Sequence, residues 1–356
     1  MKNIEYIIRS LKKGAKKKKL LTGFVISNTS KKFNGKYFTT PIRETKNILF
    51  SGVIIYSDKI LSKIIKKIDG KVDYIIIDAE KKISAVFSKD GVTKDGVTAN
   101  IERTSKELIK KSKIFIFKAN DLTLDAIDTF ISQMTSKDIR GLGNKKVTIL
   151  GAGNLGSKLA LRMVERGANV TIMRRNIKKM RIIVNALNLI KPKYTNSKIQ
   201  GSSNKYEASK KSDILICTNT GEQIVDTKII SYLKSNSIIL DAGKGTIGKE
   251  ALKSAIKKNI KVFRVDVSAA FHGLMSTLLE TERILENTLG RKIINDISFV
   301  SGGLLAQKNE VVVDDINRPR FFYGIGDGNG DFLRNINFTK KNYKKIKKLI
   351  KILKLK

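Results

Sequence analysis

The stretch VTILGAGNLG, residues 147–156, decides the fold of this chain. Four strand-forming residues lead directly into a glycine-rich turn. Gly151, Gly153 and Gly156 have the spacing GxGxxG, and apolar residues recur at helical spacing from Leu155 onward. A strand, a glycine-rich turn and a helix in this order are typical of a Rossmann-type dinucleotide-binding domain.

Each glycine has its own physical reason to stand where it does. Gly151 permits a tight turn, Gly153 lets the backbone approach a pyrophosphate, and Gly156 lets the helix pack closely on the sheet. The first amides of the helix, at Asn154 and Leu155, would then face the phosphates, because the N-terminus of a helix attracts anions. The alternative is a glycine turn in an α/β domain that binds no nucleotide.

The end of the next strand, NVTIM (residues 169–173), distinguishes between two dinucleotides. A domain for NAD(H) normally has Asp or Glu there, about 20 residues after the glycines, to accept hydrogen bonds from the ribose hydroxyls. This chain has Arg174 and Arg175 instead. A guanidinium forms charge-assisted hydrogen bonds with a 2′-phosphate, which a carboxylate repels. The sequence therefore predicts NADP(H) as the cofactor, and the alternative is that both arginines are ordinary surface charges.

Strands and helices alternate from residue 144 onward, which predicts a parallel sheet with right-handed crossovers. The predicted strands are VTIL, NVTIM, DILICT, SIILDA and KVFRVDV. Ligands of such sheets bind at the carboxyl ends of the strands. Thr218, Asn219 and Thr220 lie at one such end, and we expect them to contact the cofactor.

A second α/β pattern precedes this region. The predicted elements are a strand at 47–56, a helix at 58–68, strands at 73–78 and 113–117, and helices at 101–111 and 120–134. The repeat KDGVTKDGVT (residues 89–98) is interpreted as a loop, because Asp-Gly pairs favour tight turns. Residues 1–40 give no clear pattern.

The predicted fold is therefore α/β, with a Rossmann-type parallel-sheet domain, a smaller N-terminal α/β domain and a C-terminal extension. The predicted parts are an N-terminal substrate domain at 1–118, a linking helix at 119–140, an NADP-binding domain at 141–290 and an extension at 291–356 that packs back on the body. A chain of 356 residues is long enough for two cores.

Composition narrows the class of protein. One cysteine and one histidine leave no set of metal ligands, so no metal site is expected. The net charge of +39 invites a nucleic-acid partner, but the lysines are scattered over every segment, as in a chain of biased composition. No apolar run reaches the roughly 18 residues of a membrane span and no leader is evident. We therefore expect a cytoplasmic protein, with a homodimer as a prior.

From Val147 to Gly290 the order of features resembles the shikimate dehydrogenase-like oxidoreductases of the amino-acid-dehydrogenase-like superfamily. The matching features are the GAG turn, the arginines of MRRN, the strand-closing Asp241, the helix EALKSAIKKNI and the segment HGLMSTLLE. Glu280 stands where the family has a glutamine. The family's Asn-Val-Thr-x-Pro-x-Lys string and serine-rich pocket are absent, so the resemblance implies architecture and reaction type but not shikimate as the substrate.

The resemblance also implies two residues for proton transfer. In the family, an Asp just ahead of the linking helix acts with a Lys of the first domain at the hydroxyl that is oxidised. Asp121, in NDLT, matches that Asp, and Lys81, just beyond DYIIIDAE, is the candidate for the Lys. The alternative role for Asp121 is to cap the N-terminus of the helix.

The predicted function is that of an NADP-dependent dehydrogenase or reductase. It would transfer a hydride to or from a C–O or C–N carbon of a small polar substrate, in a cleft between two domains. One alternative is a non-catalytic protein that senses NADP or serves as an interaction module. A second alternative is a basic nucleic-acid-binding protein, whose affinity would fall steeply with salt.

Overall fold

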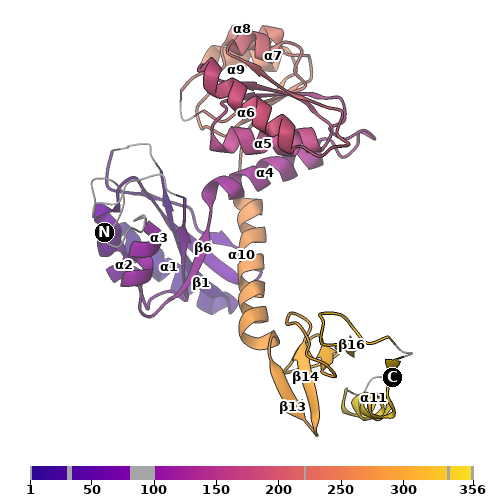
Figure 1. Cartoon of the computed structure of the whole chain (residues 1–356). Helices are drawn as coiled ribbons and strands as arrows, with labels where there is room; N and C mark the ends of the chain where they lie inside the picture. The colour runs from indigo at the N-terminus through magenta and orange to yellow at the C-terminus, as the bar shows by residue number, and fades with distance from the viewer. Residues whose placement is uncertain (1, 30–33, 81–100, 220–221, 335–336, 354–356) are drawn as a thin grey trace. The chain divides into compact units, whose positions relative to one another are not determined.

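The computed structural model describes residues 2–29, 34–80, 101–219, 222–334 and 337–353. Lys81, Thr220 and the repeat at 89–98 lie outside the described residues. The chain divides into two compact units, Met1–Leu274 and Met275–Lys356 (Figure 1). The domain boundaries expected from the sequence remain predictions.

The N-terminal sheet of the first unit has a parallel centre. Its strands lie in the order β2-β4-β1-β5-β6, with β3 also on β4. Their bounds are β1 Leu21–Asn28, β2 Phe38–Thr39, β3 Arg43–Glu44, β4 Ile48–Ile55, β5 Tyr74–Asp78 and β6 Lys113–Phe117. Strands β4, β1, β5 and β6 run parallel, and the short β2 and β3 pair antiparallel with β4. The carboxyl ends of the parallel strands therefore meet at one edge, where ligands of such sheets bind.

Three helices cover one face of this sheet: α1 Lys2–Lys18, α2 Leu61–Ile68 and α3 Ile101–Leu108. Helix α1 buries Ile4, Ile8, Leu11 and Ala15 at helical spacing. It and β1 were not predicted: charged residues interrupt the apolar pattern of α1, and Thr22 and Gly23 interrupt that of β1. The other face carries Phe50 and Phe117, whose rings pack on Phe271. Phe271 belongs to α10 (Ser268–Arg283).

The second sheet of the first unit is wholly parallel and confirms the predicted α/β class. Its order is β12-β11-β10-β7-β8-β9. The bounds are β7 Lys146–Leu150, β8 Asn169–Met173, β9 Ile199–Ser202, β10 Ile214–Cys217, β11 Ile238–Asp241 and β12 Lys261–Arg264. The order reverses between β7 and β10, and a reversal of this kind marks the ligand crevice of an open α/β sheet. Strand β9 was missed because its sequence, IQGS, has no apolar run.

Helices cover both faces of this sheet (Figure 1). Their bounds are α4 Ala119–Met134, α5 Asn154–Glu165, α6 Ile177–Ile190, α7 Lys205–Ser209, α8 Thr227–Tyr232 and α9 Lys249–Lys257. Helix α4 belongs to the same core as α5, because Leu124, Ile127 and Ile131 share a buried cluster with Leu159 and Met163. The helix predicted as a link between domains is therefore packed firmly on the glycine-turn helix.

The second unit has a small core of its own. Its four strands lie in the order β13-β14-β15-β16. The elements are a π-helical turn Ile284–Thr288, β13 Arg291–Ile294, β14 Ile297–Ser301, β15 Val311–Val313, β16 Phe322–Ile325 and α11 Lys340–Leu353. The buried cluster consists of Ile297, Phe299, Val311, Val313, Ile316 and Leu349. Leu349 brings α11 into this core.

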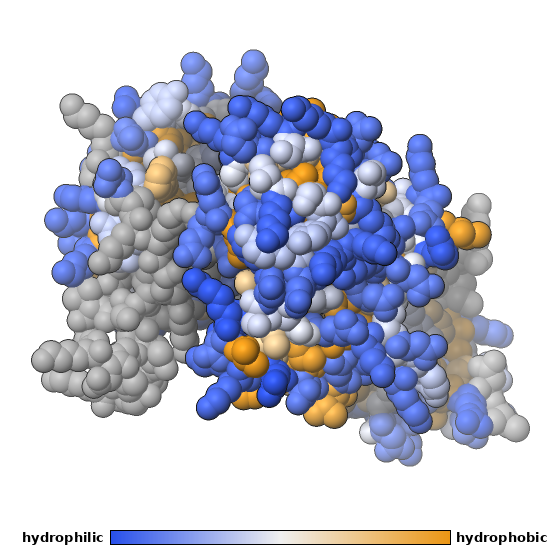
Figure 2. All heavy atoms as spheres, turned by 90° about the horizontal axis from the view of Figure 1, so that it is seen from above, coloured by the Kyte–Doolittle hydropathy of each residue, from blue (hydrophilic) through white to orange (hydrophobic). Residues whose placement is uncertain are grey.

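Hydrophilic side chains predominate on the face shown in Figure 2, with small apolar patches between them. This distribution agrees with lysines scattered along the whole sequence. Among the described residues, no helix combines the length and apolar character needed to cross a bilayer.

Candidate nucleotide-binding site

The glycine-rich turn joins β7 to α5 through contacts that exclude larger residues at two of its three glycines. Gly151 has φ +116°, a left-handed conformation that favours glycine. A Cβ on Gly156 would lie 1.8 Å from the carbonyl oxygen of Gly151. Gly153 differs, because a Cβ there would meet no atom within 4 Å. The turn is thus closed at Gly151 and Gly156 and open at Gly153.

The first turn of α5 offers backbone amides to this open space. The helix begins at Asn154, and its N-cap Gly153 provides no side-chain cap. The free N–H groups and the positive end of the helix dipole therefore favour an anion at this place. The amides of Asn154 and Leu155, predicted to face phosphates, belong to this turn.

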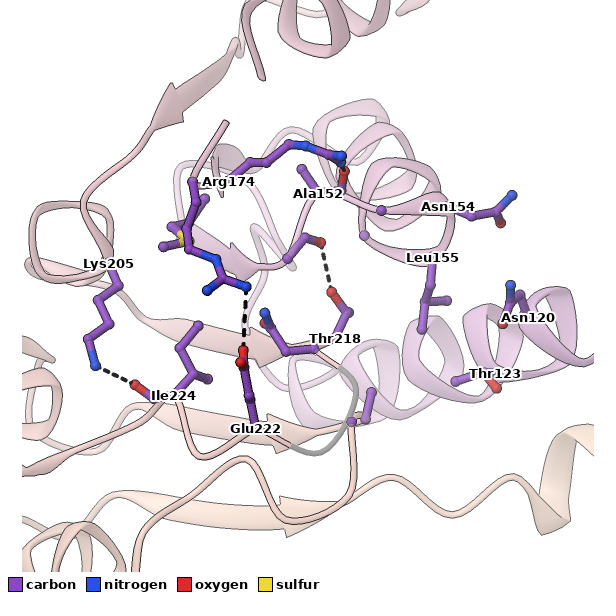
Figure 3. A pocket seen from close by; sticks show the side chains of 18 of the residues that line it. Asn120, Thr123, Ala152, Asn154, Leu155, Arg174, Lys205, Thr218, Glu222 and Ile224 are labelled. Atoms are coloured by element: carbon purple, nitrogen blue, oxygen red, sulfur yellow. Dashed lines mark hydrogen bonds and ion pairs between the residues drawn. The ribbon is translucent and has the colours of Figure 1, made fainter. Parts of the chain in front are cut away.

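A cavity of about 1030 Å³ lies in front of the turn (Figure 3). Its lining comes from the glycine turn, the ends of β8, β10 and β11, the segment at 222–224, the end of β1 and the start of α4. The predicted residues that line it are Gly151, Gly153, Asn154, Leu155, Gly156, Arg174, Arg175, Thr218 and Asn219. Its size is in the range of ligand pockets in proteins.

The two arginines after β8 have different environments. The guanidinium of Arg174 donates a hydrogen bond to the carbonyl oxygen of Ala152, within the glycine turn. The side chain of Arg175 is 82% exposed, and its Nη2 lies 3.6 Å from Oε2 of Glu222. The hydrogen bond of Arg174 therefore stabilises the turn, whereas the exposed guanidinium of Arg175 is available to an anion in the cavity.

The two described residues at the end of β10 lie directly against the glycine turn. The hydroxyl of Thr218 donates to the carbonyl oxygen of Gly151 at 2.7 Å. The Oδ1 atom of Asn219 is buried and has no hydrogen-bond partner within the described structure. A buried amide oxygen without a donor costs free energy, roughly 1–3 kcal/mol. A bound ligand with a hydroxyl or amide donor would remove that cost.

Lys205, at the start of α7, lines the cavity but was not predicted. Its Nζ donates to Oδ2 of Asp226 at 2.7 Å and to the carbonyl oxygen of Ile224 at 2.9 Å. Burial lowers the pKa of Lys205, but the hydrogen bond and charge of Asp226, together with Tyr206, outweigh burial, so the pKa is raised overall. Lys205 follows the end of β9. Because β9 was not predicted from the sequence, Lys205 could not be predicted as a residue at the carboxyl end of a strand.

Helix α4 contributes Asn120 and Thr123 to the cavity lining, whereas Asp121 is not part of that lining. The carboxylate of Asp121 pairs with Lys118 at 2.8 Å and with Lys158 of α5. Burial raises the pKa of Asp121, but hydrogen bonds from the two lysines outweigh this and place it below its usual value. Asp121 is thus a carboxylate held toward α5.

The capping role considered for Asp121 is wrong. The N-cap residue of α4 is Lys118, which makes no side-chain cap. Instead, the amide of Ala119 donates to Oδ1 of Asp78, and the amide of Asn120 donates to Oε2 of Glu80, both at 3.2 Å. The end of β5 therefore supplies the acceptors for the first turn of α4, a long-range pairing that local sequence does not encode.

Cys217 is fully buried at the end of β10, and burial raises the pKa of its thiol to about 12, which suppresses the reactive thiolate. Within the described ranges, no group of three or more His, Cys, Asp or Glu side chains is arranged to hold a metal ion.

Residues 146–245 match the family model described as "NADP oxidoreductase coenzyme F420-dependent". This region is an oxidoreductase-type, NAD(P)-binding Rossmann domain. The match covers less than a third of the chain, and no curated protein matches the sequence. The finer resemblance to shikimate dehydrogenase-like enzymes remains a prediction.

Solved structures with a similar fold include several dehydrogenases. One chain of the dipicolinate synthase from Bacillus halodurans is 14% identical, with 73% of this chain and 97% of that chain covered and a TM-score of 0.36. L-tryptophan dehydrogenase from Nostoc punctiforme is 16% identical, with 66% and 61% covered and a TM-score of 0.39. At these identities and TM-scores the likeness carries no argument about substrate or reaction.

Proposed function

We propose that this chain is an NADP(H)-dependent oxidoreductase that transfers a hydride to or from a C–O or C–N carbon of a small polar substrate. The observation that carries the proposal is the combination at one cavity of an open glycine turn, an uncapped helix N-terminus and two arginines at the end of β8. These features meet the pyrophosphate and the 2′-phosphate of NADP(H) with amides and guanidinium groups.

In this proposal the adenosine end of the nucleotide lies near Arg175. Arg174 keeps the glycine turn in shape through Ala152, which leaves the exposed guanidinium of Arg175 to bind the 2′-phosphate. The pyrophosphate lies over Gly153, where the absence of a side chain leaves room. Lys205 adds a positive charge to the same cavity.

The reacting end of the nucleotide lies toward Asn219 and α4. The unpartnered Oδ1 of Asn219 fits a donor such as a ribose hydroxyl or a carboxamide. When bound, NADP(H) supplies or accepts the hydride. Asn120 and Thr123 of α4 offer an amide and a hydroxyl to a polar substrate. Thr220 is proposed to extend the contacts made by Asn219.

Proton transfer is assigned to Asp121 and Lys81 as part of the proposal. With a lowered pKa, Asp121 is ionised at neutral pH and holds a proton only transiently. Its proposed part is therefore to pair with the neighbouring Lys118 and Lys158, while Lys81 exchanges the proton with the substrate. Loss of turnover with retained NADPH binding in Lys81→Ala would support this assignment.

One observation favours a non-catalytic alternative. The lysine and glutamate of the described cavity lining, Lys205 and Glu222, are paired with Asp226 and Arg175. The part that α4 contributes, Asn120 and Thr123, has no titratable side chain, whereas proton transfer to a substrate needs a titratable group within reach. A protein that binds NADP(H) as a sensor would need no such group. Tight NADPH binding with no turnover over a broad panel of carbonyl and imine substrates would favour the sensor.

The cofactor assignment is tested by titrating the full chain with NADPH and NADH and following nucleotide fluorescence. Arg175→Ala is expected to weaken NADPH binding roughly tenfold or more, because a charge-assisted contact to the 2′-phosphate is lost. NADH, which lacks that phosphate, should bind unchanged. Arg181→Ala, which removes an exposed charge from α6 outside this cavity, serves as the matched control. A wild-type preference for NADH would overturn the NADP(H) assignment.

A further inference from the structure

Glu222 is a carboxylate in a cavity that otherwise presents cations and neutral groups. Among the described lining residues, Arg174, Arg175 and Lys205 are basic and Glu222 is acidic, and the others are uncharged. Glu222 lies on the segment after β10, and its Oε2 is 3.6 Å from Nη2 of Arg175 (Figure 3, dashed line at Glu222). The pair therefore bridges the loop after β8 and the loop after β10.

The other two basic residues of the lining, Arg174 and Lys205, do not pair with an acidic residue of the described lining. The guanidinium of Arg174 is bound to the backbone of the glycine turn, and Lys205 is bound to Asp226 and to a carbonyl group. Only the pair of Arg175 and Glu222 joins two lining side chains of opposite charge, as far as the described residues extend. Both side chains are well exposed, at 82% and 67%. Such a pair is weak and is easily exchanged for a better anion.

We propose that Glu222 is a specificity-determining residue that competes with the 2′-phosphate of the nucleotide for Arg175. This inference rests on the proposed function. A phosphate monoester carries nearly two negative charges at neutral pH, so it outcompetes one carboxylate for the guanidinium. It must nevertheless displace Glu222 and then lie near it. NADH has no 2′-phosphate and leaves the pair intact. Glu222 therefore weakens binding of NADPH and leaves that of NADH unaffected.

Replacing Glu222 tests this competition. In the full chain, Glu222→Gln is expected to tighten NADPH binding roughly three- to tenfold at low salt, because both the competing anion and its repulsion disappear. NADH binding should change less than twofold. The gain for NADPH should shrink as salt rises, since the groups are exposed and screened.

Glu250→Gln is the matched control, because Glu250 lies on α9, pairs with Lys253 and is 72% exposed. It removes the same charge from the same sheet domain but outside the cavity lining. An equal gain in NADPH affinity from this variant would overturn the inference, because it would reveal only an effect of net charge. A selective loss of NADH affinity in Glu222→Gln would also overturn it, since Glu222 would then bind the ribose hydroxyls.

The two proposals fail in distinguishable ways. If the wild-type chain binds NADPH but Glu222→Gln leaves the ratio of NADPH to NADH affinity unchanged, the inference on Glu222 alone is wrong. If the wild-type chain binds neither nucleotide, the proposed function fails and the inference fails with it. An unchanged Tm of the variant without nucleotide would show that the fold is intact, as expected for an exposed side chain.

Discussion

Gly153 and Gly156 lie three residues apart in one turn but have different surroundings. Gly153 has φ −91°, which any residue adopts, and empty space around its missing Cβ. We predict that Gly153→Ala folds with an unchanged Tm but binds NADPH roughly tenfold more weakly or worse, because the methyl group occupies the place of the pyrophosphate. Fluorescence titration measures the affinity, and thermal unfolding without nucleotide measures the fold.

Gly156→Ala is the counterpart of that variant. The Cβ would collide with the carbonyl oxygen of Gly151, so we expect a loss of about 2 kcal/mol in the free energy of unfolding, as for an overpacked core.

If Gly153→Ala retains full NADPH affinity, the pyrophosphate does not lie over the turn. The sequence motif predicts different roles for the two glycines, and the structure gives the space around each missing Cβ.

Helices α4 and α5 are joined by a row of ion pairs as well as by their apolar faces. Asp121, Asp125 and Asp128 of α4 face the basic residues Lys158, Arg162 and Arg166 of α5. The spacing of three to four residues on each helix places every partner on one face. Asn120 and Thr123 of α4 line the cavity. The row of ion pairs explains why Asp121 faces α5.

The contribution of Asp121 to this row is expected to depend on pH. Burial raises its pKa, but the hydrogen bonds and charges of Lys118 and Lys158 together lower it by more. The pKa in the folded chain therefore lies below that in the unfolded chain. A carboxyl group of this kind stabilises the fold above its unfolded pKa of about 4, and the contribution is lost as pH falls through the lower, folded pKa. Asp121→Asn should therefore be less stable than wild type at pH 7.

Urea unfolding at pH 7 and at about pH 3 tests this prediction. The difference at pH 7 should stay below about 1 kcal/mol, because the side chain is partly exposed to solvent. It should be smaller at about pH 3, because the contribution decreases as pH falls toward the folded pKa. An equal difference at both values would mean that Asp121 acts through its shape and not through its charge.

At the level of elements, periodicity predicted the strands and helices with uninterrupted apolar patterns. It missed α1, where charged residues interrupt the apolar ones, β1, whose sequence LTGFVISN has no strict alternation, and β9, which is short and polar. Strand β9 forms because β8 offers it a backbone ladder from Val170 to Met173. Pairing of this kind stabilises a strand through tertiary contacts, which override its weak local propensity.

The chain divides into two units, and each has buried clusters of its own: several in the first unit and one described in the second. We predict two unfolding transitions in calorimetry of the full chain, and we expect NADPH to raise the temperature of one of them. Ligand binding to the native state alone stabilises it by about 2.7 kcal/mol at a hundredfold excess over Kd. The first unit, which contains the cavity, should therefore unfold at a higher temperature with NADPH, while the second should be unaffected. Equal shifts of both transitions would contradict this.

The sequence by itself determined the α/β class, the strand–turn–helix at 147–156 and the basic residues at the end of β8, because spacing and residue type act locally. Tertiary structure alone decided that Arg174 binds the turn while Arg175 faces Glu222, that Asp78 and Glu80 supply the acceptors for the first turn of α4, and that Asn120 and Thr123, but not Asp121, line the cavity. These partners are distant in sequence. Only the folded chain brings them within hydrogen-bonding or ion-pairing distance.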